Sequence, residues 1–299
     1  MKRNKTELAV CLSAFFAFCV LCGAGSLFQR YSFVQTGVGV LLSETVAFVP
    51  VILLLYRVAP DATSFETFRL PQQSHPIEAF LFVCSAGAAV TFLSFLLNYL
   101  VYFLTSFTDV SLDTAMVSTQ LSSGASPWFL IVSIIIPAFL EEFYLRGMMQ
   151  SVLKTELNQL HLILFSGFLF ALLHGSLQNF IGPLVAGMFY SWLVCTLGSV
   201  WYAVLAHCIH SALFSALSWL LEFFSTFGIW SRFPAISSIL FLLFLYISLR
   251  FAERLVVHRR FEEVERKNSS YRFVGKLFGN VGMIALLFAY IAKAVFGII

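Results

Sequence analysis

The chain has 299 residues, of which 60% are hydrophobic and only 11% are charged, and its formal net charge at pH 7 is +3. Soluble globular domains carry about 25% charged residues, so this composition excludes an ordinary soluble domain. The small net charge gives no support to nucleic-acid binding, and a mean hydropathy of +0.89 indicates an integral membrane protein.

Long apolar runs set the organisation of the chain. A helix needs about 20 consecutive, mostly apolar residues to cross a bilayer. We therefore predict an all-α fold, a polytopic transmembrane bundle of about eight or nine spanning helices, with no separate soluble domain. The predicted spans are residues 8–28, 37–56, 78–104, 126–152, 160–177, 180–197, 199–221, 233–250 and 274–298.

The first apolar run follows Lys2, Arg3 and Lys5 and leads into small residues at 23–25. A secretory signal peptide has the same pattern. The length of the run and the further spans after it favour an uncleaved membrane anchor.

Lysine and arginine are distributed unevenly between the connecting segments. If the N-terminus is inside, the inner segments hold most of them, above all the basic loop 250–276, whereas the outer loop 105–125 has none. Because short cytoplasmic segments of membrane proteins are enriched in Lys and Arg, we expect a cytoplasmic N-terminus. The shortness of the loops and the absence of an organelle signal favour a bacterial cytoplasmic membrane.

Few ionisable residues lie within the predicted spans, where a charge is costly and usually functional. Away from the helix ends they are Glu44, Glu141, Glu142, Arg146, His174, His207 and His210. At 1.5 Å per residue, Glu141 lies about 16 Å, His207 roughly 13 Å and His174 roughly 22 Å from the inner ends of their helices. These depths allow three helices to bring one carboxylate and two imidazoles together. Glu44, isolated in its span, is more simply explained as an interhelical or snorkelling residue.

Helical spacing separates the two adjacent glutamates. Glu142 and Arg146 are four residues apart, so they share a helix face and can form an ion pair. Glu141 is turned about 100° away from Glu142 and is left free to act as a general base. A packing clamp would explain the Glu142–Arg146 pair equally well when the pair is considered alone.

A second polar face is predicted on the seventh run. His207, His210 and Ser211 lie at steps of three and four, so their side chains point in similar directions. Imidazole and hydroxyl groups there can donate hydrogen bonds to a developing oxyanion. A single histidine in a membrane helix is usually an interhelical hydrogen-bonding residue. The occurrence of Glu-Glu, His and His on three long helices is what favours a catalytic site.

These residues fall in three short motifs that resemble those of a known family. The sequence "EEFYLRG", beginning at Glu141, is similar to the E-E-x-x-x-R motif of the CAAX-protease and bacteriocin-processing (CPBP, or Abi) intramembrane proteases. "FALLH" corresponds to the second motif, F-x-x-x-H, with Phe170 and His174. "HCIHS" corresponds to the third, H-x-x-x-N, with His207 matching and Ser211 in place of the asparagine.

The resemblance covers about residues 125–220 and defines a predicted catalytic core. The flanking segments, 1–120 and 225–299, resemble only generic membrane helices, and the second of them includes the basic loop 250–276. We therefore expect the chemistry to lie in the middle third of the chain.

The family implies a role for each matching residue. Glu141 would activate water, His174 would position that water, and His207 would stabilise the tetrahedral oxyanion. Glu142 and Arg146 would hold the shape of the site.

The third motif departs from the family pattern at its last position. The hydroxyl of Ser211 reaches less far than an asparagine amide and donates one hydrogen bond. His210, the preceding residue, is a candidate to replace the missing donor. Since losing one oxyanion donor costs about 10²–10³ in rate, this departure predicts a slower enzyme with the same mechanism.

The predicted activity is that of an intramembrane endopeptidase, similar to the CAAX proteases, which hydrolyses a peptide bond near the inner membrane face. Its partners would be the lipid bilayer and a membrane-associated protein or peptide substrate, with no nucleic acid. Two alternatives stay open: a catalytically weak or inactive scaffold or bacteriocin-immunity protein, and a proton-coupled transporter.

A metal is a further question that the motifs raise, because the family has been described as metalloprotease-like. Glu141, His174 and His207 supply the nitrogen and oxygen donors that zinc accepts. The chain lacks an H-E-x-x-H motif, and its six cysteines lie in apolar runs without zinc-site spacing. Because a glutamate and a histidine can activate water by themselves, we expect no tightly bound metal.

Overall fold

The computed structural model describes residues 2–31, 37–60, 65–69, 75–105, 107, 127–177, 179–223, 233–256 and 270–296. Every element within these residues is a helix, so the predicted all-α class is confirmed. In chain order they are α1 (Lys2–Tyr31), α2 (Val38–Val58), the 3-10 helix η2 (Phe65–Phe68), α3 (Pro76–Thr105), α4 (Pro127–Glu142), the π-helix η3 (Phe143–Met149), α5 (Gln150–Leu153), α6 (Gln159–Leu173), α7 (Ile181–Leu197), α8 (Val200–Phe223), α9 (Phe233–Val256), α10 (Ser270–Phe278) and α11 (Val281–Phe296).

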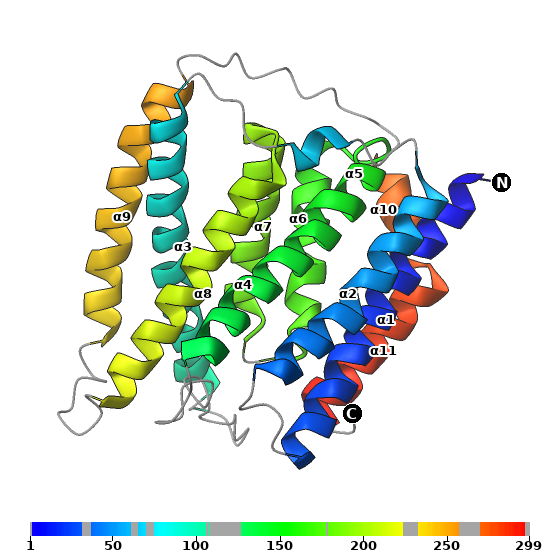
Figure 1. Cartoon of the computed structure of the whole chain (residues 1–299), viewed down its shortest axis with the longest axis horizontal. Helices are drawn as coiled ribbons and strands as arrows, with labels where there is room; N and C mark the ends of the chain where they lie inside the picture. The colour runs from blue at the N-terminus through cyan, green and yellow to red at the C-terminus, as the bar shows by residue number, and fades with distance from the viewer. Residues whose placement is uncertain are drawn as a thin grey trace.

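The long helices lie side by side as a bundle (Figure 1). Helices α3 and α9 form one edge, helices α1, α2 and α11 form the other, and α4, α6, α7 and α8 lie between them. The two termini lie at opposite ends of the bundle, in agreement with an odd number of crossings.

Each predicted apolar run coincides with helix, but not every helix is long enough to span by itself. Among the described residues, five helices are long and apolar enough to cross a membrane, or six if the bent pair α10–α11 is one span. Helices α6 and α7 are apolar but have only 15 and 17 residues. These two, with the segment 127–153 that η3 interrupts, account for the difference from about eight or nine predicted spans.

The last predicted span, 274–298, is broken in the structure. Helices α10 and α11 meet at an angle of 60°. The break lies at Gly279 and Asn280, where the Asn280 Oδ1 accepts a hydrogen bond of 3.0 Å from the backbone N–H of Gly282 and so caps α11. Helix α10 buries Phe273 and Leu277 and exposes its opposite side, as an amphipathic helix at the membrane surface does.

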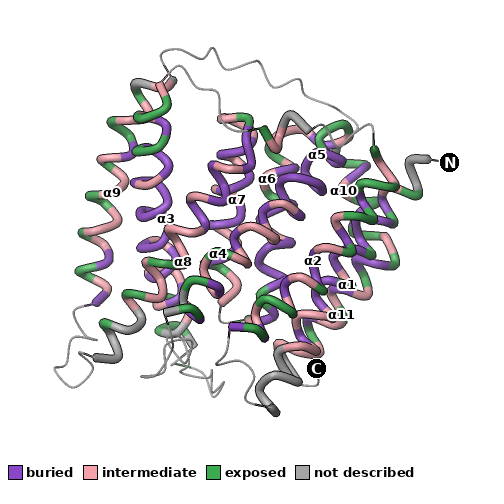
Figure 2. The backbone as a smooth tube through the Cα atoms, in the orientation of Figure 1, coloured by how far each residue is buried: buried purple, intermediate pink, exposed green. Residues whose placement is uncertain are grey.

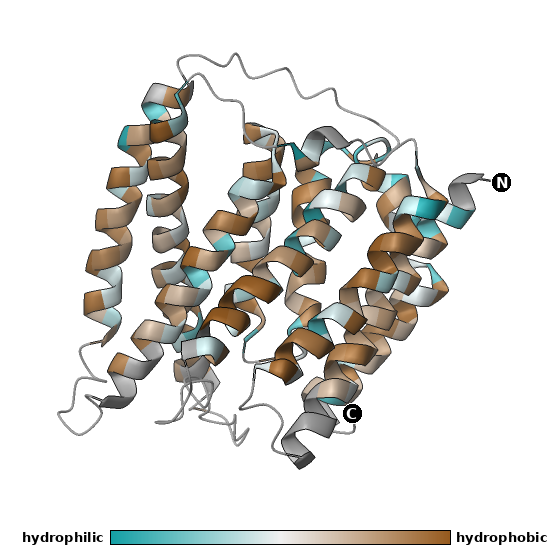
Figure 3. Ribbon diagram, in the orientation of Figure 1, coloured by the Kyte–Doolittle hydropathy of each residue, from teal (hydrophilic) through white to brown (hydrophobic). Residues whose placement is uncertain are grey.

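The outward surface is apolar, and the core lies along the inner faces of the helices, including those of α1, α2 and α11. Purple, buried segments concentrate along the inner faces of the bundle (Figure 2), and hydrophobic residues cover most of the helix length (Figure 3). Ile239, Leu242 and Tyr246 on α9 are each at least 60% exposed. Large apolar side chains exposed in this number are expected of a lipid-facing surface.

The termini of the central helices follow ordinary capping rules. Asn158 caps α6 by accepting a hydrogen bond of 2.9 Å from the N–H of His161. Gly198, with φ of 78°, ends α7 in the left-handed conformation that favours glycine. The predicted loop 105–125 lies outside the described residues except for 105 and 107, and so do residues 257–269 of the loop 250–276.

Candidate active site

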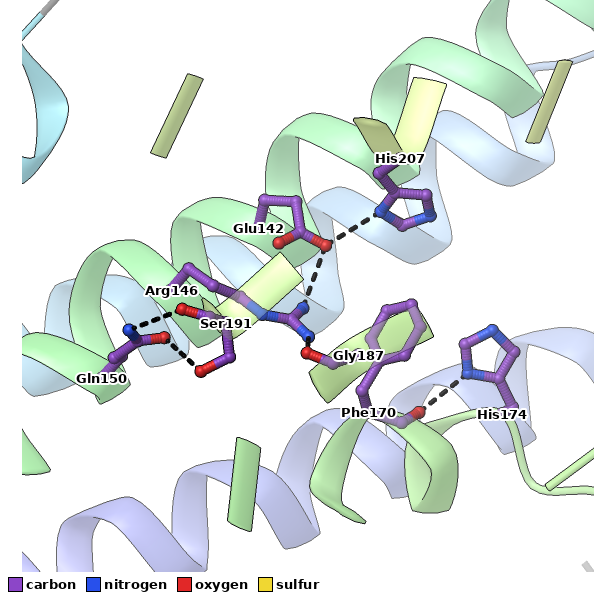
Figure 4. Close-up of polar contacts among 8 residues, drawn as sticks. All are labelled: Glu142, Arg146, Gln150, Phe170, His174, Gly187, Ser191 and His207. Atoms are coloured by element: carbon purple, nitrogen blue, oxygen red, sulfur yellow. Dashed lines mark hydrogen bonds and ion pairs between the residues drawn. The ribbon is translucent and has the colours of Figure 1, made fainter. Parts of the chain in front are cut away.

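A carboxylate, a guanidinium and an imidazole meet inside the bundle. The Nη1 of Arg146 donates to the Oε1 of Glu142 at 2.9 Å, and the Nδ1 of His207 lies 2.9 Å from the same oxygen (Figure 4). Glu142 and Arg146 are fully buried, and His207 is 6% exposed. The predicted ion pair between Glu142 and Arg146 is therefore confirmed, and the structure adds His207 to it.

Arg146 is held by contacts with the neighbouring helices α6 and α7. Its Nη2 donates to the backbone carbonyl of Gly187 on α7 at 2.7 Å. Its guanidinium carbon lies 4.9 Å from the ring centroid of Phe170 and 5.5 Å from that of Tyr190. Charge-assisted hydrogen bonds and cation–π contacts together compensate for removing the cation from water.

The backbone that carries Arg146 is a π-helix, η3. The N–H of Gln150 bonds to the carbonyl of Leu145, the i−5 spacing of this helix type. Pro137 lies inside α4, one turn before Glu141. Because proline has no backbone N–H, one intrahelical hydrogen bond is also missing there. Such local departures from the α-helix occur frequently at functional sites.

The ring of His207 has a fixed orientation. It stacks on Tyr190 with centroids 5.2 Å apart and an interplanar angle of 18°, and it meets the edge of Phe170 at 5.5 Å. A carboxylate oxygen accepts hydrogen bonds, so the Nδ1 of His207 carries the proton and donates it to Glu142. The Nε2 atom is then left for a reacting group.

His174 lies just beyond the end of α6, and its side chain is exposed. Its Nδ1 lies 2.8 Å from the backbone carbonyl oxygen of Phe170. Since a carbonyl can only accept, Nδ1 is the protonated nitrogen and the Nε2 of the neutral ring keeps its lone pair. The ring of Phe170 lies between His174 and the Glu142–His207 pair (Figure 4).

Glu141 stands apart from the hydrogen-bonded cluster. It is half-buried, and it forms no hydrogen bond to another residue in the part of the chain that the structure describes. Its electrostatic neighbours are Glu44, Glu142 and Arg146. The division between a braced Glu142 and a free Glu141 follows the prediction from helical spacing, although the catalytic role of Glu141 stays a prediction.

His210 and Ser211 lie on α8 beyond His207. The Nδ1 of His210 is 3.4 Å from the hydroxyl of Thr91 on α3, and that hydroxyl donates to the Gly87 carbonyl at 2.9 Å. His210 is therefore the donor to Thr91 and faces α3, whereas His207 faces α4. Ser211 is half-buried and makes no hydrogen bond within the described ranges.

In the described segments no three His, Cys, Asp or Glu side chains lie close enough together to hold a metal ion. The Oε1 of Glu142 is also occupied by the cationic Arg146, and a second cation at that oxygen would be repelled. The set Glu141, His174 and His207 does not fit zinc in this arrangement.

Sequence reasoning missed the contribution of α7. Gly187, Tyr190 and Ser191 share a face at steps of three and four. Gly187 accepts from Arg146, Tyr190 stacks on His207, and the Ser191 hydroxyl donates to Gln150 at 2.9 Å. The run of small and polar residues on one face of an apolar helix was the available signal.

Comparison with known proteins identifies the central segment. Residues 123–213 match the family model described as "Type II CAAX prenyl endopeptidase Rce1-like". This range contains all three motifs and confirms the resemblance to the CPBP family that they indicated. No curated protein and no solved structure matches the chain.

Proposed function

We propose that this integral membrane protein, with a central segment similar to the type II CAAX prenyl endopeptidases, hydrolyses peptide bonds within or next to the bilayer. The observation that carries the proposal is the contact of 2.9 Å between the Nδ1 of His207 and the Oε1 of Glu142. It orients an imidazole inside an apolar bundle, next to a half-buried Glu141 and an exposed His174.

The first step is the activation of water. Glu141 accepts a proton from a water molecule while the oxygen of that water attacks the carbonyl carbon of the substrate. The Nε2 of His174 accepts a hydrogen bond from the same water and orients it, because its Nδ1 is fixed by the carbonyl of Phe170.

The second step is stabilisation of the negative charge on the former carbonyl oxygen. His207, when protonated at Nε2 as well, donates a hydrogen bond to this oxygen, and Glu142 balances the charge on the ring. Glu141 then returns its proton to the leaving amine, and the C–N bond breaks. Arg146 takes no proton and keeps Glu142 in place.

The substrate class that the family suggests is a prenylated protein with a C-terminal CAAX sequence. The wild-type chain, purified into proteoliposomes, should release a tripeptide from a farnesylated CAAX peptide, as measured by mass spectrometry. Glu141→Gln should abolish release. Glu253→Gln, the same change at a residue on α9 that is 68% exposed, should leave release unchanged.

The same preparation separates the alternative functions. Retention of the peptide without cleavage by both wild type and Glu141→Gln would contradict the enzyme and favour a scaffold. A proton flux across the vesicle membrane that depends on Glu141, without cleavage, would favour the transporter. Farnesylated peptides without a free C-terminal tripeptide serve as the substrate control.

A further inference from the structure

Helix α2 carries a buried carboxyl group that the proposed mechanism does not use. Glu44 is 8% exposed, and its Oε2 has no hydrogen-bond partner among the described residues. The residues around it on the inner face of α2 are apolar or small, including Ala47, Phe48 and Val51. A buried polar group without a partner costs about 1–3 kcal/mol of stability, so such groups are retained mainly where they have a function.

The packing of α2 on α4 places Glu44 opposite Glu141. Both helices run in the same direction along the bundle (Figure 1). Their lower ends touch where a Cβ on Gly37 would meet the backbone of Phe129 at 3.4 Å. Higher up, the rings of Phe48 and Tyr144 lie 5.5 Å apart.

This register fixes the pairing of the two glutamates. Glu44 precedes Phe48 by four residues, one turn of α2. Glu141 precedes Tyr144 by three residues, at the junction of α4 and the π-helix η3, so both glutamates lie below the ring contact. Glu44 is also an electrostatic neighbour of Glu141. The two glutamates therefore lie near each other at the interface between α2 and α4.

We propose that Glu44 is a positioning residue for Glu141, an inference that rests on the proposed function. The two carboxyl groups form no hydrogen bond to each other in the structure, but when one of them is protonated its O–H can donate a short hydrogen bond to the carboxylate of the other. This bond would fix the side-chain rotamer of Glu141, which has no other hydrogen-bond partner among the described residues. The base is then aimed at its water before the substrate arrives.

The test compares Glu44→Leu, Glu44→Gln and the matched control Glu7→Leu in proteoliposomes. Glu7 is a second buried glutamate, 6% exposed, on α1. Glu44→Leu should lower kcat by about 10²-fold with KM within about twofold, since misplacement of a catalytic group has costs of this size. Glu44→Gln, which keeps an N–H donor, should recover at least tenfold of that loss, and Glu7→Leu should keep wild-type kcat.

Thermal unfolding of the same variants distinguishes positioning from a structural role. Removing an unpartnered buried carboxyl should leave the Tm of Glu44→Leu equal to or above that of wild type, whereas loss of a structural contact would lower it.

Three results would overturn the proposal. If Glu44→Leu keeps the wild-type kcat while Glu141→Gln is inactive, Glu44 has no positioning role, and the proposed protease function still stands. A lower Tm in parallel with the lower kcat would make Glu44 a structural residue. Cleavage that is unaffected by Glu141→Gln would remove the proposed function itself, and the role of Glu44 with it.

Discussion

At the scale of single residues, the buried Arg146 supports the site. Its guanidinium bridges Glu142 on its own chain segment and Gly187 on α7. A buried ion pair is costly to assemble, but removal of one partner leaves an uncompensated charge inside the protein.

Arg146→Met should therefore destabilise the protein by about 3–5 kcal/mol. Reversible unfolding in detergent micelles measures the change. Arg250→Met is the control, because Arg250 forms an ion pair with Glu253 at 3.5 Å while 60% exposed, and such surface pairs contribute about 0–1 kcal/mol. Equal stability of Arg146→Met and wild type would contradict the bracing role.

His174 gives the second prediction at this scale. Its Nδ1 is committed to the carbonyl of Phe170, so only Nε2 can act on water. His174→Ala should lower kcat by about 10²–10⁴-fold, the usual contribution of a positioned acid–base group, with the fold preserved because the side chain is exposed. The cleavage assay measures the change in kcat, and circular dichroism checks that the fold is preserved. A kcat within threefold of wild type would exclude His174 from the chemistry.

Local spacing predicted part of this residue-scale arrangement. The pairing of Glu142 with Arg146 follows from a step of four on one helix, and the structure confirms it. The contact of His207 with Glu142 depends on how α8 crosses α4, which no pattern within one helix specifies. The same reason explains why Tyr190 and Glu44 were not recognised as neighbours of the site.

At the scale of helices, the approach of α6 to α7 sets the position of the Arg146 acceptor. A Cβ on Gly187 would lie 2.9 Å from the Cβ of Phe170 and 3.0 Å from the Cα of Gly167. Small residues let membrane helices approach closely in this way. The backbone carbonyl of Gly187 can therefore reach the guanidinium.

Gly187→Ala should separate the two helices and lower both stability and activity. Overpacking of this kind costs typically about 1–3 kcal/mol. Gly23→Ala on α1 is the control, since a Cβ there meets nothing within 4 Å. In thermal unfolding and in the cleavage assay, Gly187→Ala should have a lower Tm and a lower activity than Gly23→Ala. Equal Tm and activity in the two variants would contradict a packing requirement at Gly187.

The sequence predicts where the membrane helices lie, but not where two of them are interrupted. Apolar runs of about 20 residues predict membrane helices from composition alone, and each run is helical in the structure. The π-helix η3 and the 60° bend before α11 arise from contacts and caps that hydropathy does not register. Asn280 beside Gly279 was the local signal for the bend.

At the scale of the whole molecule, the basic residues lie mainly toward one end. Figure 1 places the N-terminus, the α5–α6 turn and the start of α10 at that end. The described basic residues there are Lys5, Arg57, Arg69, Lys154, Arg250, Arg272 and Lys276. Arg30 and Lys293 lie toward the other end. The distribution supports our proposal that the N-terminal end faces the cytoplasm.

Cysteine labelling tests this orientation. In a cysteine-free background, Lys154→Cys lies in the α5–α6 turn, and Leu177→Cys lies in the connection between α6 and α7 at the other end; both positions are exposed. A membrane-impermeant maleimide should label only Leu177→Cys in intact cells and Lys154→Cys only after the inner face is opened. The reverse pattern would invert the proposed topology.

The proposed peptidase activity of this membrane protein depends on Glu141. The most direct measurement compares cells with wild type and cells with Glu141→Gln, at equal membrane levels, by mass spectrometry of protein N- and C-termini. We predict new termini that occur only with wild type and that identify the substrate and its cleavage site. Identical termini in the two strains, with any phenotype of the wild-type protein preserved in Glu141→Gln, would contradict the enzyme and leave the scaffold.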